Sequence, residues 1–171
     1  MFRLILASAL IAIAYGTSIR GSGGQVAKVS QICDHPKFNP SNSYDYDFSV
    51  LKLKESFKLG CTVNTIELVP QEEEVETGTL GTVTGWDDQR CADLYEPWDI
   101  TLRMICYGSD EGGKGSCSGD TGGPIVVNGR VSGLVSWAAG CSQPIYPTIY
   151  YRLSSPEIVA HLNHCLEKFN L

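Results

Sequence analysis

Ten residues, Gly115–Pro124, carry the most distinctive arrangement of chemically useful groups in the sequence: Gly-Ser-Cys-Ser-Gly-Asp-Thr-Gly-Gly-Pro. The four glycines permit backbone turns that a side chain would forbid. Asp120 and Thr121 stand between Gly119 and Gly122, so a carboxylate and a hydroxyl are presented on a tight loop. Such a loop can direct several backbone N–H groups at one point, as stabilisation of an oxyanion requires. We therefore interpret the segment as an oxyanion-binding loop rather than a plain glycine-rich turn.

This loop resembles the nucleophile loop of the trypsin and chymotrypsin family, Gly-Asp-Ser-Gly-Gly-Pro, with Thr121 where the family carries its serine. The resemblance continues in Tyr46–Leu53, Gly81–Trp86, Met104–Gly108, Val135–Trp137 with Cys141, and Ile149–Leu153. It implies an all-β fold, the chymotrypsin-like double β-barrel with a C-terminal α-helix. It also implies a peptide or protein as substrate or ligand, and neither a cofactor nor a metal.

The resemblance assigns catalytic positions to the loop and to one distant carboxylate. Asp47 matches the family's orienting aspartate, and Thr121 matches the nucleophile. The N–H groups of Gly119 and Thr121 match the oxyanion hole. Asp120 matches the aspartate that pairs with the family's freed N-terminal amine, which makes it a structural residue.

The resemblance also assigns the positions that would bind a peptide. Ser136 and Trp137 lie on the strand along which the family holds its peptide substrate. Gly115 stands where a trypsin has its aspartate, so a bound Arg or Lys side chain would meet no countercharge. Ala138 and Thr148 stand where open pockets carry glycine, so their side chains would narrow the site. We expect a bound side chain to be small and neutral.

A catalytic histidine is missing from this pattern. Catalysis in the family needs a hydroxyl, a histidine that accepts its proton and a carboxylate that fixes the histidine tautomer. Of the three histidines, His35 is interpreted as a surface turn residue, and His161 and His164 as exposed or capping residues of the terminal helix. An internal threonine without a base is a poor nucleophile.

Several family segments also have no match: Ile-Val-Gly-Gly, Ala-Ala-His-Cys, and a strand between Trp86 and Cys91. We therefore expect a partial first barrel and a second barrel that lacks a strand. Three hypotheses follow. The chain is a catalytically inactive homologue that binds peptides or proteins, with active proteases of the same family as further candidate partners; it is an active serine endopeptidase; or it is an incomplete or spliced copy of an active enzyme.

Alternating and β-branched segments, separated by turn residues, predict many short strands. The predicted strands are Gln25–Ile32, Asp47–Lys54, Val63–Val69, Thr79–Trp86, Leu102–Tyr107 and Thr148–Leu153, with a hairpin over Pro124–Trp137. Asn128-Gly129 supplies the two positive-φ residues of a type I′ turn in that hairpin.

One helix is predicted after the last strand. Ser154 and Glu157 form a capping box with Pro156 in the first turn. The apolar stripe of this helix is Ile158, Leu162, Leu166 and Phe169.

Composition and the N-terminal residues predict a secreted domain. The chain has 171 residues and a formal net charge of −6, which argues against nucleic acid as a partner. Arg3 and the apolar run Leu4–Ala14 predict a signal peptide, residues 1–16, cut near Gly16; a membrane anchor is the alternative. The run is too short to span a bilayer. Residues 17–171 then form the domain, with the first barrel in 17–70, a linker in 70–78 and the second barrel and helix in 79–171.

Seven cysteines in an oxidising compartment are expected to pair, with at least one left over. The family resemblance implies Cys91–Cys106 and Cys117–Cys141. Cys33, Cys61 and Cys165 remain, and either Cys33 or Cys61 can pair with Cys165.

Overall fold

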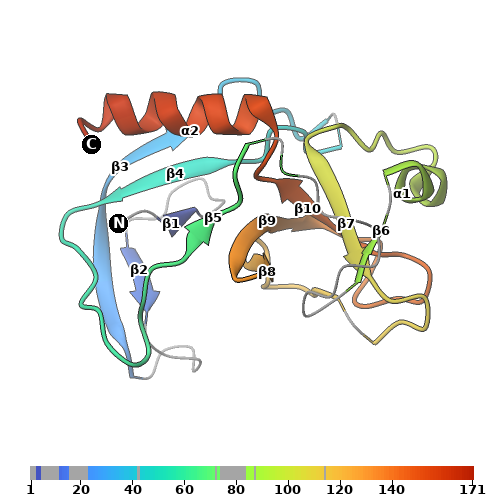
Figure 1. Ribbon diagram of the computed structural model, residues 1–171, viewed down its shortest axis with the longest axis horizontal. Coiled ribbons are helices and arrows are strands. Elements are labelled where there is room, and N and C mark those ends of the chain that lie inside the picture. Colours follow the sequence, from blue (N-terminus) through green and yellow to red (C-terminus); the bar gives the residue numbers. More distant parts are fainter. Residues whose placement is uncertain are drawn as a thin grey trace.

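The computed structural model describes residues 3–4, 12–15, 23–41, 43–71, 73, 84–86, 88–113 and 115–171. Within them lie a four-stranded sheet, in the order β1-β4-β3-β2, and a six-stranded sheet, in the order β5-β9-β10-β7-β6 with β8 paired to β9. Figure 1 shows the first sheet beside the second, with helix α2 lying along β3 and β4. This is the expected all-β fold, an incomplete double β-barrel with a C-terminal helix.

The first sheet is built on two long antiparallel neighbours, β3 (Gln25–Asp34) and β4 (Ser49–Leu53). Both were predicted, although β3 extends two residues further and β4 is shorter at both ends. The predicted strand over Val63–Val69 is reduced to β5 (Glu67–Leu68), which pairs in parallel with β9 of the second sheet. A stretch assigned to the first barrel thus lies at the edge of the second.

Two further strands fall within the predicted signal peptide: β1 (Arg3–Leu4) and β2 (Ala12–Tyr15). β2 pairs antiparallel with β3, and β1 pairs with β4. Removal of residues 1–16 would therefore leave only β3 and β4, each with one edge whose backbone N–H and C=O groups are open to another strand.

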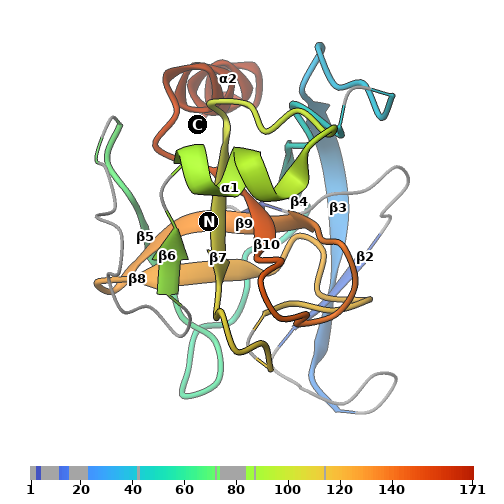
Figure 2. The ribbon, with the colours of Figure 1, turned by 90° about the vertical axis from the view of Figure 1, so that its right-hand side faces the viewer.

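The second sheet contains the predicted hairpin, with β8 (Pro124–Val127) joined to β9 (Arg130–Trp137). Asn128 and Gly129 have φ of 50° and 77°, as the type I′ turn requires, so this prediction is confirmed. β10 (Thr148–Arg152) lies between β9 and β7 (Met104–Gly108). β6 (Thr84–Trp86) is the last strand of this sheet and pairs with β7. The rest of its predicted strand, 79–83, lies outside the described residues. Figure 2 shows helix α1 in front of the second sheet.

Helix α1 (Asp88–Tyr95) was not predicted. It begins directly after β6, within the interval where a family strand was expected to be missing. Cys91 and Tyr95, one turn apart, are its buried residues, and Cys91 is bonded to Cys106 of β7. The helix is only eight residues long, so hydrophobic periodicity gave a weak signal for it.

Helix α2 (Pro156–Lys168) was predicted, but the capping box was wrong. The N-cap is Ser155, with φ −60° and ψ 132°, and it makes no side-chain cap hydrogen bond. Its hydroxyl donates to the Glu157 carboxylate at 2.9 Å. Ser154, the predicted cap, lies one residue before the N-cap, and both serines are buried.

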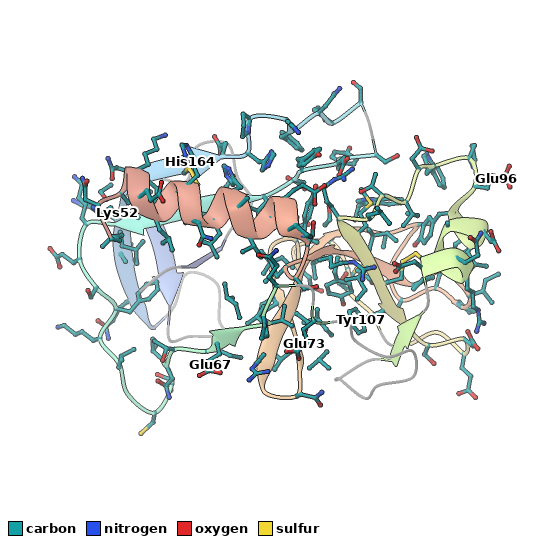
Figure 3. All side chains as sticks on the ribbon, turned by 45° about the horizontal axis from the view of Figure 1, so that its top comes forward. Lys52, Glu67, Glu73, Glu96, Tyr107 and His164 are labelled. Carbon is teal, nitrogen blue, oxygen red and sulfur yellow. A yellow bond between two sulfur atoms is a disulfide. The ribbon has the colours of Figure 1, made fainter. Side chains whose placement is uncertain are left out.

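The buried face of α2 also differs from the predicted stripe. Ile158 and Phe169 are buried as predicted, whereas Leu162 and Leu166 are only partly buried. The other buried positions are His161 and Cys165. The interpretation of His161 as exposed or capping was therefore wrong, because the periodicity argument counted apolar residues alone. His164 is exposed, as expected, and lies on the outer side of α2 in Figure 3.

One core cluster joins α2 to both sheets. It includes Phe48 and Val50 from the first sheet region, Val131 and Tyr151 from the second, and Ile158 from the helix. At the far end of the helix, the Lys52 ammonium of β4 donates to the Phe169 carbonyl at 2.5 Å. The helix therefore holds the two sheets in one unit, which fixes any site between them.

Three disulfides are present: Cys91–Cys106, Cys117–Cys141 and Cys33–Cys165. The first two are the pairs that the family resemblance implied, and the third decides between the two pairings left open. Cys61 is exposed and is the unpaired cysteine. Among the described residues, neither helix has the length and apolarity that crossing a bilayer would need.

Candidate functional site

Asp47 lies where the two sheets meet, in the segment that leads into β4. The Ser136 hydroxyl of β9 donates to Asp47 Oδ2 at 3.4 Å. The Asp47 backbone N–H donates to the Tyr151 hydroxyl of β10, and that hydroxyl donates to the Tyr44 carbonyl at 2.7 Å. The structure thus brings together Asp47 and Ser136, which were predicted separately, and hydrogen bonds tie the Asp47 segment to β9 and β10 of the second sheet.

Burial raises the pKa of Asp47 to about 6, and the Ser136 hydrogen bond opposes that shift. No charged partner contributes to it. Within the described part of the chain, the only side-chain hydrogen bond of this carboxylate is with a hydroxyl. The carboxylate is therefore destabilised at neutral pH.

Asp47→Asn is expected to stabilise the protein at pH 7.5 by about 1 kcal/mol, after allowance for the partial exposure of the group. The native-state pKa lies above the usual value of 3.8. The folded protein therefore retains a proton that the unfolded chain loses between about pH 4 and 6, and stability falls as pH rises through that window. Thermal unfolding of both proteins at pH 4 and 7.5 measures the effect. An asparagine variant that is less stable at pH 7.5 would contradict it.

The oxyanion-binding loop is anchored on β9 by backbone hydrogen bonds. The Gly122 N–H donates to the Val135 carbonyl at 2.8 Å, and the Val135 N–H donates to the Gly123 carbonyl at 2.8 Å. Gly119 and Gly122 have φ of 102° and 80°, a region that favours glycine. Thr121, between them, is exposed.

Asp120 is bound to its own loop. Its Oδ2 accepts the Cys117 N–H at 2.9 Å, and its backbone carbonyl accepts the Gly123 N–H at 2.7 Å. Across the described residues, the N–H groups of Gly119 and Thr121 donate to no protein acceptor. The two donors predicted for an oxyanion thus have no protein acceptor within the described part of the chain, and the Asp120 carboxylate holds the loop through Cys117.

Among the predicted pocket residues, Thr148 fills the space next to Gly115 with its side chain. Its Oγ1 accepts the Ser116 N–H at 3.0 Å and lies 3.1 Å from the Ser116 hydroxyl oxygen. A Cβ added at Gly115 would stand 3.1 Å from the same Oγ1. Thr148 is 2% exposed, so it occupies the space beside Gly115.

The aromatic wall next to these positions was not predicted as a group. Trp137 packs edge-on against Tyr95 of α1, with ring centroids 5.0 Å apart, and against Trp98 at 6.2 Å. Ala138, the next residue after Trp137, is half-buried. Helix α1 therefore supports the end of the strand on which a peptide was expected to bind.

All three histidines lie on the side of the first sheet and α2. The His35 ring lies 4.4 Å from the ring of His161, which lies 6.3 Å from that of His164. His35 is 8% exposed and stacks on Tyr46 at 4.4 Å, so its interpretation as a surface residue was wrong. Burial, with the His161 and Lys37 charges, lowers its pKa to about 4. No histidine hydrogen-bonds to Asp47 in the described part.

A buried ion pair beside Asp47 was missed. The Arg103 guanidinium donates to both Asp45 oxygens, at 3.0 and 2.6 Å, and its face covers the Tyr46 ring at 4.5 Å. Thr101 also donates to Asp45 at 3.1 Å. Burial alone would raise the pKa of Asp45, but the Arg103 hydrogen bonds and charge lower it. This pair joins the segment that carries Asp47 to the second sheet.

The chain is similar to trypsins over most of its length. The trypsin family model matches residues 7–158. A vitellin-degrading protease of Bombyx mori is 35% identical over 165 residues, covering 84% of this chain and 62% of that protein. Trypsin 5G1 of Aedes aegypti is 35% identical over 162 residues, covering 82% and 60%.

The solved structures include a close match in shape. Neuropsin, a serine protease expressed in the limbic system of mouse brain, superposes with a TM-score of 0.81 at 25% identity, covering 96% of this chain and 84% of that one. The chain spans about three fifths of the length of the curated relatives that it matches. The family match begins at residue 7, so it overlaps the predicted signal peptide.

Proposed function

Because the chain belongs to the trypsin family of serine proteases, we propose that it is a secreted, catalytically inactive member that binds a peptide or protein segment along β9. The observation that carries this proposal is the pairing of the Asp47 carboxylate with the Ser136 hydroxyl, at 3.4 Å, without an imidazole. Thr121, at the nucleophile position, then has no base to accept its proton.

Three features of the site support the proposal that the chain binds a peptide. The loop is fixed to β9, the Gly119 and Thr121 N–H groups have no protein acceptor among the described residues, and Trp137 is supported by Tyr95. These features suit an extended peptide with a carbonyl group near the loop. Three disulfides agree with an extracellular location.

The expected ligand side chain at the anchoring position is small and neutral. Thr148 lies where a longer side chain would enter, and Gly115 offers no carboxylate. Short peptides with Ala or Val there are expected to bind at least tenfold more tightly than peptides with Arg or Phe. Isothermal titration of the four peptides measures this preference, and tighter binding of the Arg peptide would contradict it.

A pair of variants checks that Thr148 sets the preference. Thr148→Gly is expected to bring the Phe peptide to within about threefold of the Ala peptide, since it removes the side chain beside Gly115. Thr65→Gly, at an exposed loop position, is the matched control and should leave the order of affinities unchanged.

The second candidate function is that of a serine endopeptidase, of which this chain is an incomplete or spliced copy. The span of about three fifths of the curated relatives favours it. A transcript or genomic neighbourhood that encodes an Ala-Ala-His-Cys segment between Arg20 and Gly21 would support this candidate over the first.

A further inference from the structure

A row of four stacked side chains runs from the second sheet to α2. The Arg103 guanidinium, directly before β7, lies 4.5 Å from the centre of the Tyr46 ring. The Tyr46 ring stacks on His35, with centroids 4.4 Å apart and an angle of 20° between the ring planes. The His35 ring lies 4.4 Å from the ring of His161 on α2. The row therefore ends in two neighbouring imidazoles, both buried, which we call the histidine pair.

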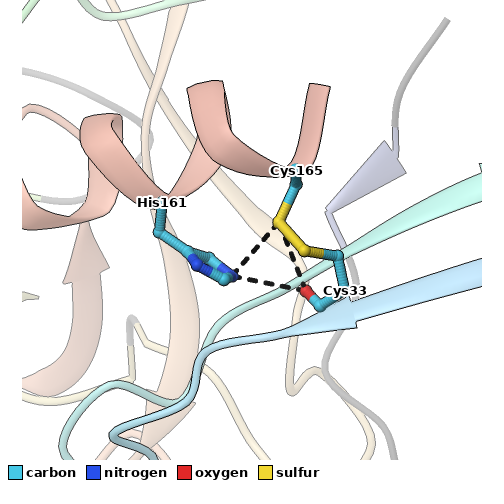
Figure 4. Close-up of side chains that lie close together, drawn as sticks. All are labelled: Cys33, His161 and Cys165. Atoms are coloured by element: carbon cyan, nitrogen blue, oxygen red, sulfur yellow. Dashed lines mark hydrogen bonds between the residues drawn. A yellow bond between two sulfur atoms is a disulfide. The ribbon is translucent and has the colours of Figure 1, made fainter. Parts of the chain in front are cut away.

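The histidine pair joins segment 35–46, which connects β3 to β4, to helix α2. Among the described residues, no hydrogen bond of this segment reaches α2. The helix itself is bonded to β3 by the Cys33–Cys165 disulfide, and Figure 4 shows the His161 imidazole beside that bond. A change at the histidine pair can therefore free the segment while the helix stays in place.

The hydrogen bond of the His35 ring requires its neutral form. Its Nδ1 accepts the Lys37 N–H at 3.2 Å, so the one proton of the neutral ring is on Nε2. A second proton would have to go to Nδ1, where it would face the N–H donor of Lys37. Protonation of His35 therefore breaks this hydrogen bond.

The charges around the histidine pair also disfavour protonation. The groups that act on His35 are His161, Lys37, Asp45 and Arg103, and those that act on His161, besides His35, are His164, Asp34 and Lys168. Asp45 is already paired with Arg103 at 2.6 Å, so it offers His35 little countercharge. Two protonated rings with centroids 4.4 Å apart would repel each other.

We propose that the histidine pair is an acid-sensitive contact, which holds segment 35–46 on α2 at neutral pH and releases it in acid. The Cys33–Cys165 disulfide keeps α2 attached to β3 during this release. The chain thereby adopts a different conformation in acidic surroundings. The release does not depend on whether β9 binds a peptide, because it concerns only the packing of this segment.

The direction of the pH dependence follows from the two rings. Burial, with the charges of His161 and Lys37, lowers the pKa of His35 to about 4. Burial also lowers the pKa of His161, which the Cys33 carbonyl opposes. The released segment regains the ordinary value of about 6.5 and binds more protons. The stability of the closed contact is therefore complete above about pH 6.5 and is lost as pH falls from there towards 4.

Hydrogen–deuterium exchange of the full chain, with its disulfides intact, tests the release at pH 7.5 and 5.0. Protection factors, which are corrected for the intrinsic pH dependence of exchange, are expected to fall at least tenfold in residues 35–46 at pH 5.0. The amides of β9, such as that of Val135, should change less than threefold. An unchanged segment, or an equal loss across both sheets, would overturn the proposal.

Two variants each remove one titrating ring and keep one hydrogen-bonding atom. His35→Asn supplies an oxygen for the Lys37 N–H, and His161→Gln supplies an amide N–H for the Cys33 carbonyl. The loss of protection at pH 5.0 is expected to be less than threefold in His35→Asn and smaller than that of the parent in His161→Gln. A tenfold loss that survives in His35→Asn would overturn the proposal.

Two controls separate the histidine pair from other titrating groups. His164→Gln, at an exposed position of the same helix, should keep the loss seen in the parent. Asp47 is present in every variant, and its protonation stabilises the fold as pH falls, so it opposes the release. In the parent, the NMR titration of the His35 imidazole should have a midpoint near 4. A midpoint near 6.5 would contradict the proposal even if both variants fail to fold.

Discussion

The purified chain is expected to hydrolyse a peptide ester on the order of a millionfold more slowly than a trypsin under the same conditions. Loss of the catalytic histidine alone costs subtilisin about that factor in kcat. In this chain, Asp47 is hydrogen-bonded to Ser136 rather than to an imidazole. The three histidines lie on the α2 side of the first sheet. Thr121 adds a methyl group that restricts its χ1 angle.

Thr121→Ser is expected to leave ester turnover within tenfold of the parent, because it restores the attacking group but no base. Ser118→Ala, at an exposed hydroxyl of the same loop, is the matched control. Active-site titration with a burst substrate and mass spectrometry for an acyl-enzyme check the result. Turnover that co-purifies with the chain and is abolished by Thr121→Ala would show that the chain is an enzyme.

Arg103→Leu is expected to destabilise the protein by about 3–5 kcal/mol, the usual cost of leaving one partner of a buried ion pair uncompensated. Asp45 is 3% exposed, and Arg103 donates to both of its carboxylate oxygens. Chemical denaturation at pH 7.5, with the disulfides intact, measures the loss. Arg130→Leu is the control, because its partners Glu67 and Glu73 are exposed or partly exposed, and it should cost less than about 1 kcal/mol.

The cost of Arg103→Leu should also depend on pH. Arg103 lowers the pKa of Asp45 in the parent, so the stability contributed by the pair is present above the unfolded value and is lost as pH falls through the native one. The gap between parent and variant should therefore shrink below about pH 4. The double variant Asp45→Leu/Arg103→Leu should recover most of the loss. If the difference in the free energy of unfolding between parent and Arg103→Leu is constant from pH 3 to 7.5, the destabilisation comes from lost packing and not from the ion pair.

Local chemistry explains which elements could be predicted from the sequence. The β8–β9 hairpin depends on Asn128 and Gly129, whose backbone preferences act over two residues. Helix α1 was missed because it is only eight residues long and buries two of them, Cys91 and Tyr95, which is too short a segment for a helical period to stand out. The N-cap at Ser155 was missed because two adjacent serines carry the same hydroxyl, and the sequence does not show at which of them the helix begins.

The site was predictable in its parts but not in its contacts. The loop and Asp47 were placed by their resemblance to one family, residue by residue. The hydrogen bond from Ser136 to Asp47 joins residues 89 positions apart, and the Arg103 pair joins residues 58 apart. Contacts between residues so far apart in the sequence leave no pattern in the neighbouring residues from which they could be predicted. Burial of His161 was missed because only apolar residues were counted when the buried face of α2 was predicted.

The covalent bond between Cys33 and Cys165, across 132 positions, has a consequence for limited proteolysis of the chain. A single cut anywhere from residue 71 to 90 would yield two polypeptides that still travel as one molecule. On a denaturing gel, the nicked protein would keep its full mass until a thiol reagent is added, and would then separate into two bands.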